Sequence, residues 1–341
     1  MIDPIMRSDL ELLAGQLDQQ EFQSKKILVT GGAGFIGSWL CDVLVLMDAV
    51  VYCVDNLSTG LPDNTDHLLD RRTFLFRELD VVDHEPDNER YDFVLHFASR
   101  AAPEEYQRHP VETLMVNSFG TRNMLELARK IDACLIYASS SEVYGDAQSI
   151  PTPETYPGKV NPIGPRSCYD EGKRFGEALC MAYHRTYGLD TRIVRIFNTY
   201  GPRLRSDGLY ARALSRFIVQ ALLGRDLTVY GKGDQTRSFC YITDTVAAIL
   251  RVATQAKMKG GVVNIGNPQE VTILELAEKI RGIANSRSRI TFHSRPPDDP
   301  QRRCPDISRT KKLLNWSPTI KLEDGLRKTI AWFRQRALTR K

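Results

Sequence analysis

The feature that most constrains the fold is a run of glycines near the start of the chain. The β-branched segment Lys26–Thr30 is followed directly by Gly31, Gly34 and Gly37, and a helical pattern begins within this run. Glycines at this spacing allow a tight turn after a strand, close approach of the backbone to a phosphate group, and close packing of the next helix on the sheet. The run therefore predicts a strand, a turn and a helix that together bind a dinucleotide.

Short β-branched segments alternate with helical patterns over the first 200 residues. The expected strands cover 26–30, 50–54, 73–79, 93–98, 133–138 and 192–197, and the expected helices cover 35–47, 111–130 and 169–187. Strands separated by helix-length segments are typical of parallel sheets with helices on both faces. The sequence thus predicts an α/β fold in which residues 25–200 form a doubly wound parallel sheet that binds the dinucleotide.

The pattern changes after residue 197, where loops rich in glycine, proline and arginine separate shorter helices. Helices are expected at 209–223, 244–253, 273–284 and 322–335. We expect residues 201–341 to form mainly a smaller C-terminal α/β domain that binds the substrate. Residues 1–24 are expected to be a peripheral N-terminal arm.

Composition excludes several classes of protein. The chain has 46 Lys and Arg against 42 Asp and Glu, a net charge of +4, and the two signs are interleaved, so we expect no nucleic-acid partner. Its longest apolar segments fall far below the roughly 18 residues of a membrane helix, and we find no secretory signal, so a cytoplasmic protein without a membrane partner is expected. Seven scattered cysteines and six scattered histidines predict neither a disulfide framework nor a metal site.

An acidic residue at the end of the second strand indicates which dinucleotide is bound. Asp55 lies 24 residues after Gly31. A carboxylate at this position accepts hydrogen bonds from the ribose hydroxyls of adenosine and repels a ribose phosphate, which favours NAD over NADP. The other predicted cofactor-binding residues begin the first helix or follow the ends of strands, and they are Phe35, Ile36, Asn56, Asp80, Val81 and Ala98.

A tyrosine and a lysine four residues apart form the predicted catalytic pair. On a helix, Tyr169 and Lys173 share one face, and a neighbouring ammonium group is expected to lower the pKa of the phenol from about 10 towards neutrality. Ser140 lies 29 residues before Tyr169, at the end of an expected strand, where it can hydrogen-bond the same substrate oxygen. We predict that this trio performs acid–base chemistry and that Tyr169 and Lys173 also contact the cofactor.

In these motifs the chain resembles the extended short-chain dehydrogenase/reductase family over residues 26 to about 336. Within that family, segments 141–146, 161–174, 195–203 and 298–306 resemble the UDP-glucuronate decarboxylases, also called UDP-xylose synthases. The resemblance implies a Rossmann fold, bound NAD and a homodimer. It also implies that the sugar is oxidised at carbon 4, loses its carboxylate as carbon dioxide, and is reduced again to UDP-xylose.

The two residues that directly follow Ser140 distinguish a decarboxylase from related enzymes of the family. The family's 4,6-dehydratases carry an Asp–Glu pair here, whereas this chain has Ser141 and Glu142, and simple 4-epimerases usually lack the glutamate. A 4,6-dehydratase or 4-epimerase is therefore the alternative enzyme, and a non-catalytic NAD sensor is a third interpretation that the intact catalytic trio argues against. Ser141 and Glu142 are predicted to be catalytic, although a buried structural carboxylate is the other interpretation for Glu142.

Arginines are expected to bind the anionic groups of the substrate, because guanidinium groups pair well with phosphates and carboxylates. The resemblance implies that Arg237, Arg212 and Asn198 contact the pyrophosphate and uridine. It places Arg303 near the sugar, either as the cation specific to decarboxylases or as a phosphate ligand. The other predicted substrate-binding residues are Tyr106, Tyr230 and Gln235.

One segment departs from the family pattern. Residues 98–106 replace a stretch rich in proline and serine, and they place Arg100, Glu104 and Glu105 where small or neutral residues are usual. These charges are expected either to be solvated or to alter the fit of the substrate.

Overall fold

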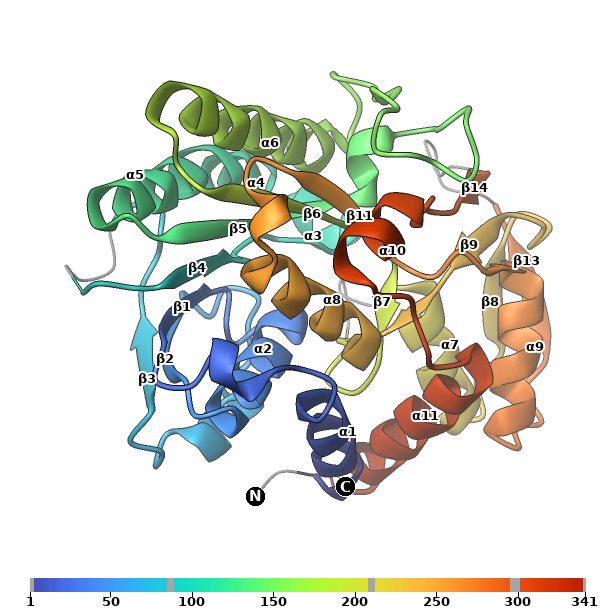
Figure 1. Cartoon of the computed structure of the whole chain (residues 1–341). Helices are drawn as coiled ribbons and strands as arrows, with labels where there is room; N and C mark the ends of the chain where they lie inside the picture. Colours follow the sequence, from blue (N-terminus) through green and yellow to red (C-terminus); the bar gives the residue numbers. More distant parts are fainter. Residues whose placement is uncertain (1–2, 85–88, 208–211, 295–300, 340–341) are drawn as a thin grey trace.

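A seven-stranded sheet lies at the centre of the computed structural model, which describes residues 3–84, 89–207, 212–294 and 301–339 (Figure 1). All neighbouring strands are parallel. In spatial order the strands are β11 (Val262–Ile265), β6 (Thr191–Ile196), β5 (Cys134–Ser140), β4 (Phe93–His96), β1 (Lys26–Thr30), β2 (Val50–Asp55) and β3 (Phe74–Glu78). This order belongs to the doubly wound dinucleotide-binding fold and confirms the predicted fold class.

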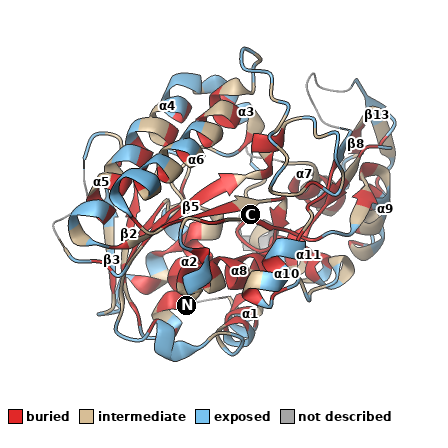
Figure 2. Cartoon of the chain, turned by 45° about the horizontal axis from the view of Figure 1, so that its top comes forward, coloured by how far each residue is buried: buried red, intermediate tan, exposed pale blue. Residues whose placement is uncertain are grey.

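Helices cover both faces of the sheet, as the alternation of strand and helix patterns predicts. One face is covered by α2 (Phe35–Leu46) and α8 (Ile242–Thr254). The other is covered by α4 (Pro110–Met115), the π-helical turn η4 (Val116–Gly120), α5 (Thr121–Ile131) and α6 (Ser167–Tyr187). The strands are buried between these layers, whereas the outer helix faces are exposed (Figure 2).

The expected domain boundary at residue 200 does not fully separate the two regions of the structure. Strand β11 pairs with β6, with Val262 opposite Ile193, and α8 packs on the same sheet. The chain therefore returns to the dinucleotide-binding sheet after residue 241. Sequence patterns missed β11 because it is only four residues long and is preceded by two glycines.

Short strands and helices make up the described part of the C-terminal region outside the central sheet. Its strand pairs are β7 (Thr199–Tyr200) with β10 (Cys240–Tyr241), and β8 (Leu227–Tyr230) with β13 (Ile290–His293), and its third sheet joins β12 (Glu270–Thr272), β9 (Thr236–Ser238) and β14 (Arg302–Arg303). Its helices are α7 (Ala213–Leu222), α9 (Ile273–Ile283), α10 (Ser308–Leu314) and α11 (Leu322–Thr339). Parts of the predicted helix 209–223 and of segment 298–306 lie outside the described residues.

Short helical segments complete the described chain: η1 (Gln19–Glu21), η2 (Pro62–Asn64), η3 (Asp66–Leu68), α3 (Pro103–Arg108), η5 (Ser141–Tyr144) and η7 (Ala256–Met258).

The N-terminal segment is packed into the core and is not a peripheral arm. Helix α1 (Pro4–Ala14) buries Met6, Leu10 and Leu13 and contacts α2 and α8. Its buried Asp9 accepts a hydrogen bond from the Tyr241 hydroxyl at 2.6 Å and forms an ion pair with Lys328 of α11. The amphipathic pattern of α1 therefore reflects packing that joins both regions of the protein.

Candidate active site

Two cavities meet above the carboxyl ends of the central strands, where sheets of this type place their ligands. The first has a volume of about 530 Å³ and the second of about 410 Å³. Ser140, at the end of β5, and Tyr169, in the first turn of α6, line both cavities. The hydroxyl-bearing residues Ser140 and Tyr169 therefore lie where the two cavities join.

The first cavity has a glycine turn at one end. Gly31 has a φ of 70°, and a Cβ there would lie 2.7 Å from the Phe97 carbonyl carbon. A Cβ at Gly37 would lie 2.1 Å from the Gly31 carbonyl oxygen, so glycine is needed for α2 to approach the turn. Helix α2 has no side-chain cap at its N-terminus, which leaves backbone N–H groups for an anion. This cradle fits a pyrophosphate.

Asp55 closes another side of the first cavity. Its carboxylate accepts hydrogen bonds from the backbone N–H groups of Ala33 at 3.0 Å and Leu57 at 2.9 Å, and burial raises its pKa. Because a carboxylate has about four acceptor positions, two remain for ribose hydroxyls. Nearby, the Asn56 amide donates to Asp80 at 2.7 Å. These contacts fit the adenosine end of a dinucleotide.

The structure brings all predicted cofactor-binding residues together in this first cavity. They are Gly31, Gly34, Phe35, Ile36, Gly37, Asp55, Asn56, Asp80, Val81, Ala98, Tyr169 and Lys173.

Tyr169 and Lys173 lie on one face of α6, as their spacing predicts. Tyr169 is buried and stacks on Tyr106, with ring centroids 5.0 Å apart and ring planes at 5°. Lys173 is also buried; its Nζ donates to the Ala138 carbonyl at 2.8 Å and lies 5.7 Å from the Tyr169 ring centroid. The helix therefore fixes both groups at the junction.

The protonation of this pair differs from the prediction. Burial raises the pKa of Tyr169 to about 12, although a hydrogen bond with Ser140 and the charge of Arg212 oppose the rise. Burial lowers the pKa of Lys173 to about 7. Removal from water disfavours the charged form of each group, and this effect exceeds the attraction expected between them. The expected lowering of the phenol pKa is therefore not found.

The second cavity contains all predicted substrate-binding residues: Tyr106, Asn198, Arg212, Tyr230, Gln235, Arg237 and Arg303. Ser141 and Glu142 also line it. Strand pairing explains one part of this set, because β14 and β9 place Arg303 directly opposite Arg237. The C-terminal region thus supplies most of the cations of this cavity.

Glu142 is held by two arginines from distant parts of the chain. Arg303 approaches both carboxylate oxygens, with Nη2 at 2.8 Å from Oε2, and Arg166 approaches from the start of α6. Burial alone would raise the pKa of Glu142, but the two guanidinium groups outweigh burial and lower it to about 2. Glu142 is therefore an ionised counterion at neutral pH.

Sequence reasoning missed two residues of this cluster. Arg166 lies at the N-terminal end of α6, three residues before Tyr169, and lines the second cavity. Asp170 directly follows Tyr169, and its Oδ2 lies 3.8 Å from Arg166 Nε. The spacing of four residues between Arg166 and Asp170 is a signal that could have indicated this pair, because residues four apart on a helix are neighbours.

Comparison with known proteins places the chain in a family. Residues 27–266 match the model of the NAD dependent epimerase/dehydratase family. The chain belongs to this family. It is 48% identical over 316 residues to UDP-glucuronic acid decarboxylase 1 of Xenopus tropicalis. The aligned residues make up 92% of this chain and 73% of that relative.

Solved structures agree with this assignment. The chain is similar to the UDP-glucose 4-epimerase of Thermotoga maritima with UDP-glucose, with a TM-score of 0.84 and 31% identity over 92% of this chain and 99% of that one. It is also similar to the UDP-glucuronic acid 4-epimerase of Bacillus cereus in complex with UDP-glucuronic acid and NAD, with a TM-score of 0.82 and 30% identity over 91% and 99% of the two chains.

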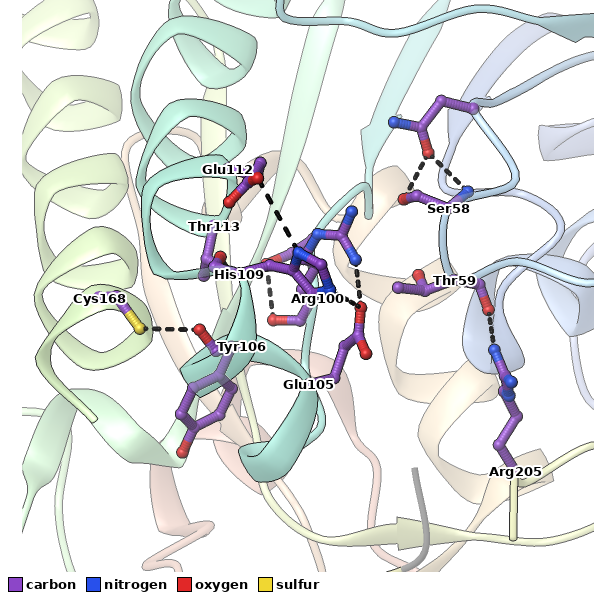
Figure 3. Close-up of polar contacts among 12 residues, drawn as sticks. Ser58, Thr59, Arg100, Glu105, Tyr106, His109, Glu112, Thr113, Cys168 and Arg205 are labelled. Atoms are coloured by element: carbon purple, nitrogen blue, oxygen red, sulfur yellow. Dashed lines mark hydrogen bonds and ion pairs between the residues drawn. The ribbon is translucent and has the colours of Figure 1, made fainter. Parts of the chain in front are cut away.

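The segment that departs from the family pattern borders both cavities. Glu105 is buried and forms an ion pair with Arg100, and Figure 3 shows these side chains pointing towards each other with His109 beside them. Arg212 donates to the Ala101 carbonyl at 2.7 Å. The Arg100–Glu105 pair is therefore not solvated, and it fixes the loop that leads to Tyr106.

The described residues contain neither a helix that could cross a membrane nor a cluster of metal ligands. None of the described helices combines the length and apolar character needed to cross a bilayer. Over the same residues, no group of three or more His, Cys, Asp or Glu side chains is placed to bind a metal ion.

Proposed function

We propose that the protein catalyses the NAD-dependent decarboxylation of UDP-glucuronate to UDP-xylose. The observation that carries the proposal is the position of Tyr169 at the junction of two cavities, with Arg303, Arg166 and Glu142 in the wall of the second. Oxidation at carbon 4 requires an acid–base group at this junction, and an anionic sugar requires cations beside it. The 48% identical relative from Xenopus tropicalis is named for the same reaction.

The first cavity is the proposed NAD site. The turn at Gly31 and the N-terminus of α2 would bind the pyrophosphate, and Asp55 would bind the adenosine ribose. NAD held by these residues would supply a reversible hydride acceptor, so that carbon 4 of the sugar could be oxidised and later reduced with no net change in the cofactor.

Tyr169 and Ser140 would act on the oxygen at carbon 4. Tyr169 takes the hydroxyl proton of carbon 4 as the ketone forms, and Ser140 donates a hydrogen bond to the same oxygen. Before this transfer Tyr169 gives up its own phenol proton to solvent, and the ammonium form of Lys173, whose Nζ lies 5.7 Å from the Tyr169 ring centroid, would stabilise the resulting phenolate. Tyr169 returns the proton to the oxygen at the end of the reaction.

Loss of carbon dioxide follows from the ketone, because the carboxylate is then in the β position. The bond between carbon 5 and the carboxylate breaks, and its electron pair moves to the oxygen at carbon 4 as an enolate. Hydrogen bonds from Tyr169 and Ser140 stabilise that oxygen. One proton from solvent then adds to carbon 5, and the ketone re-forms.

The cations of the second cavity would bind the substrate carboxylate and pyrophosphate. Glu142 keeps Arg303 and Arg166 in place before the substrate arrives, because both are paired with it. Tyr106 lines this cavity, and its buried hydroxyl has no hydrogen-bond partner among the described residues. An unpaired buried donor costs about 1–3 kcal/mol, so a polar group of the sugar is expected to pair with it.

Product analysis by mass spectrometry tests the proposal. Incubation with UDP-glucuronate should release carbon dioxide and yield UDP-xylose without accumulation of NADH. A 4-keto pentose with NADH would instead indicate release before the final reduction, and UDP-galacturonate without carbon dioxide would indicate a 4-epimerase. Turnover of UDP-glucose or UDP-galactose but not of the uronate would select the alternative dehydratase or epimerase.

The protein is also proposed to be a homodimer. Helices α4 and α6 and the turn η4 expose Leu114, Phe119, Phe175 and Tyr187, whereas the exposed Val111 lines the first cavity. Apolar side chains on an outer helix face are typical of an interface between equal subunits. Light scattering should give twice the chain mass, and Phe175→Glu should give the monomer mass.

A further inference from the structure

Asp170 is a buried acid whose surroundings do not match a carboxylate. It is 6% exposed, and its Oδ1 has no hydrogen-bond partner among the described residues. Its Oδ2 lies 3.8 Å from Arg166 Nε, beyond hydrogen-bond distance. A buried ionised carboxylate without close partners is very unfavourable.

The nearby cations are already committed to another acid. Arg303 is paired with both oxygens of Glu142, and Arg166 is paired with the same carboxylate. An ionised Asp170 would therefore share two guanidinium groups that Glu142 holds more closely. Burial and the charge of Glu142 raise the pKa of Asp170 to about 7. Geometry and charge thus both favour the protonated form of Asp170.

The groups that face Asp170 come from several elements packed around it. They are Glu142 of η5, Arg166 before α6, Arg303 of β14, Tyr106 of α3, and Tyr169 and Glu171 of α6 itself. Tyr106 and Tyr169 are neutral at physiological pH, because burial raises the pKa of each. Glu171 is about one-third exposed and pairs with Arg174 at 3.3 Å. The variable charge of the cluster is therefore that of Asp170.

We propose that Asp170 is a positioning residue that takes up a proton when the carboxylate of a uronate substrate enters the second cavity, and gives it up once that carboxylate has left as carbon dioxide. The inference rests on the proposed function. One proton moves from solvent to the Asp170 carboxyl group on binding, and one returns to solvent from the complex with the decarboxylated product. When Asp170 is protonated, the charged carboxylates beside Arg166 and Arg303 are those of Glu142 and of the substrate.

The coupling follows from the sign of the added charge. A substrate carboxylate beside Arg303 and Arg166 brings a second negative charge close to Asp170, which favours the protonated acid. Conversely, ionised Asp170 opposes binding of the carboxylate. UDP-glucuronate should therefore bind less tightly as the pH rises through 7, whereas UDP-xylose, which has the same nucleotide and pyrophosphate but no carboxylate, should not show this added dependence.

Equilibrium binding in the Tyr169→Phe background tests the proposal, because that variant should bind UDP-glucuronate without converting it. Dissociation constants for UDP-glucuronate and UDP-xylose are measured between pH 6 and pH 9. We expect the ratio of the two constants to rise by up to about tenfold for each unit by which the substrate raises the pKa of Asp170. Asp170→Asn should keep the ratio constant over this range, and the neighbouring control Glu171→Gln should behave like the background.

Calorimetry of the same Tyr169→Phe protein provides a second measurement that does not require Asp170→Asn to fold. Binding of UDP-glucuronate near pH 7.5 in two buffers of different ionisation enthalpy should show uptake of a fraction of a proton beyond that seen with UDP-xylose. Equal proton uptake for the two nucleotides, or the same pH dependence in folded Asp170→Asn, would overturn the assignment of Asp170. Absence of carbon dioxide release by the unsubstituted protein would instead overturn the proposed function.

Discussion

Arg303 and Glu142 lie 161 positions apart in the chain and form a two-pronged ion pair in the wall of the second cavity. The pair joins β14 of the C-terminal region to η5, which directly follows β5 of the central sheet. Both partners are at least partly buried, so removing one leaves a charge that water cannot fully compensate. This relationship links the substrate-binding region to the residues beside Ser140.

Arg303→Ala should abolish most of the decarboxylation while leaving cofactor binding intact. Breaking a buried ion pair costs about 3–5 kcal/mol, and the substrate also loses a cation, so we expect kcat/KM to fall by at least about a hundredfold. Carbon dioxide release measures the loss, and the NAD content of the purified variant is the control. Unchanged kinetics would remove Arg303 from the site.

Tyr169→Phe should eliminate turnover without displacing NAD. The variant keeps the ring that stacks on Tyr106 but loses the hydroxyl at the junction of the cavities. Loss of a general base typically costs about 10²–10⁴-fold in rate. The rate is measured with UDP-glucuronate, and the cofactor is quantified after denaturation. Near-normal turnover would refute the role of the phenol.

Asp170→Asn should stabilise the protein increasingly as the pH rises. In the folded chain the pKa of Asp170 is raised from the ordinary value of 3.8 to about 7, because of burial and the charge of Glu142. Between these values the folded state binds a proton that the unfolded state lacks, so stability of the unsubstituted protein falls with rising pH. The melting temperature of the variant should therefore exceed that of the parent by more at pH 8 than at pH 5. A difference independent of pH would contradict the raised pKa.

Gly37→Ala should damage the glycine turn, because the added methyl group would lie 2.1 Å from the Gly31 carbonyl oxygen. We expect loss of bound NAD and a lower melting temperature. Gly282→Ala is the matched control: a Cβ there meets nothing within 4 Å, and replacing a helical glycine by alanine stabilises by roughly 0.5–1 kcal/mol. Equal effects of the two substitutions would mean that the turn is not under steric constraint.

Local patterns were enough to predict six of the seven strands of the central sheet, the glycine turn and the catalytic pair. The strand containing Val29, the turn at Gly31 and the helical spacing of Tyr169 and Lys173 all depend on residues close together in the sequence. The resemblance to a family added the distant arginines, including Arg303. The strand, turn and helix signals are strong because each depends on the types of a few residues close together in the sequence.

The remainder depends on contacts that no local pattern records. Packing of α1 through Asp9 and Tyr241 joins positions 232 residues apart. The pairing of Glu142 with Arg166, the buried state of Asp170 and the raised pKa of Tyr169 all follow from how the chain folds around them. Spacing placed Lys173 beside Tyr169, but it did not reveal how strongly burial would act on both groups.

The most direct measurement of the central claim uses UDP-glucuronate carrying deuterium at carbon 4. The account predicts that purified protein converts it to UDP-xylose that retains deuterium at carbon 4, with one carbon dioxide released for each product and no NADH left over. Carbon dioxide release with loss of the deuterium from the product, or no carbon dioxide at all, would contradict it.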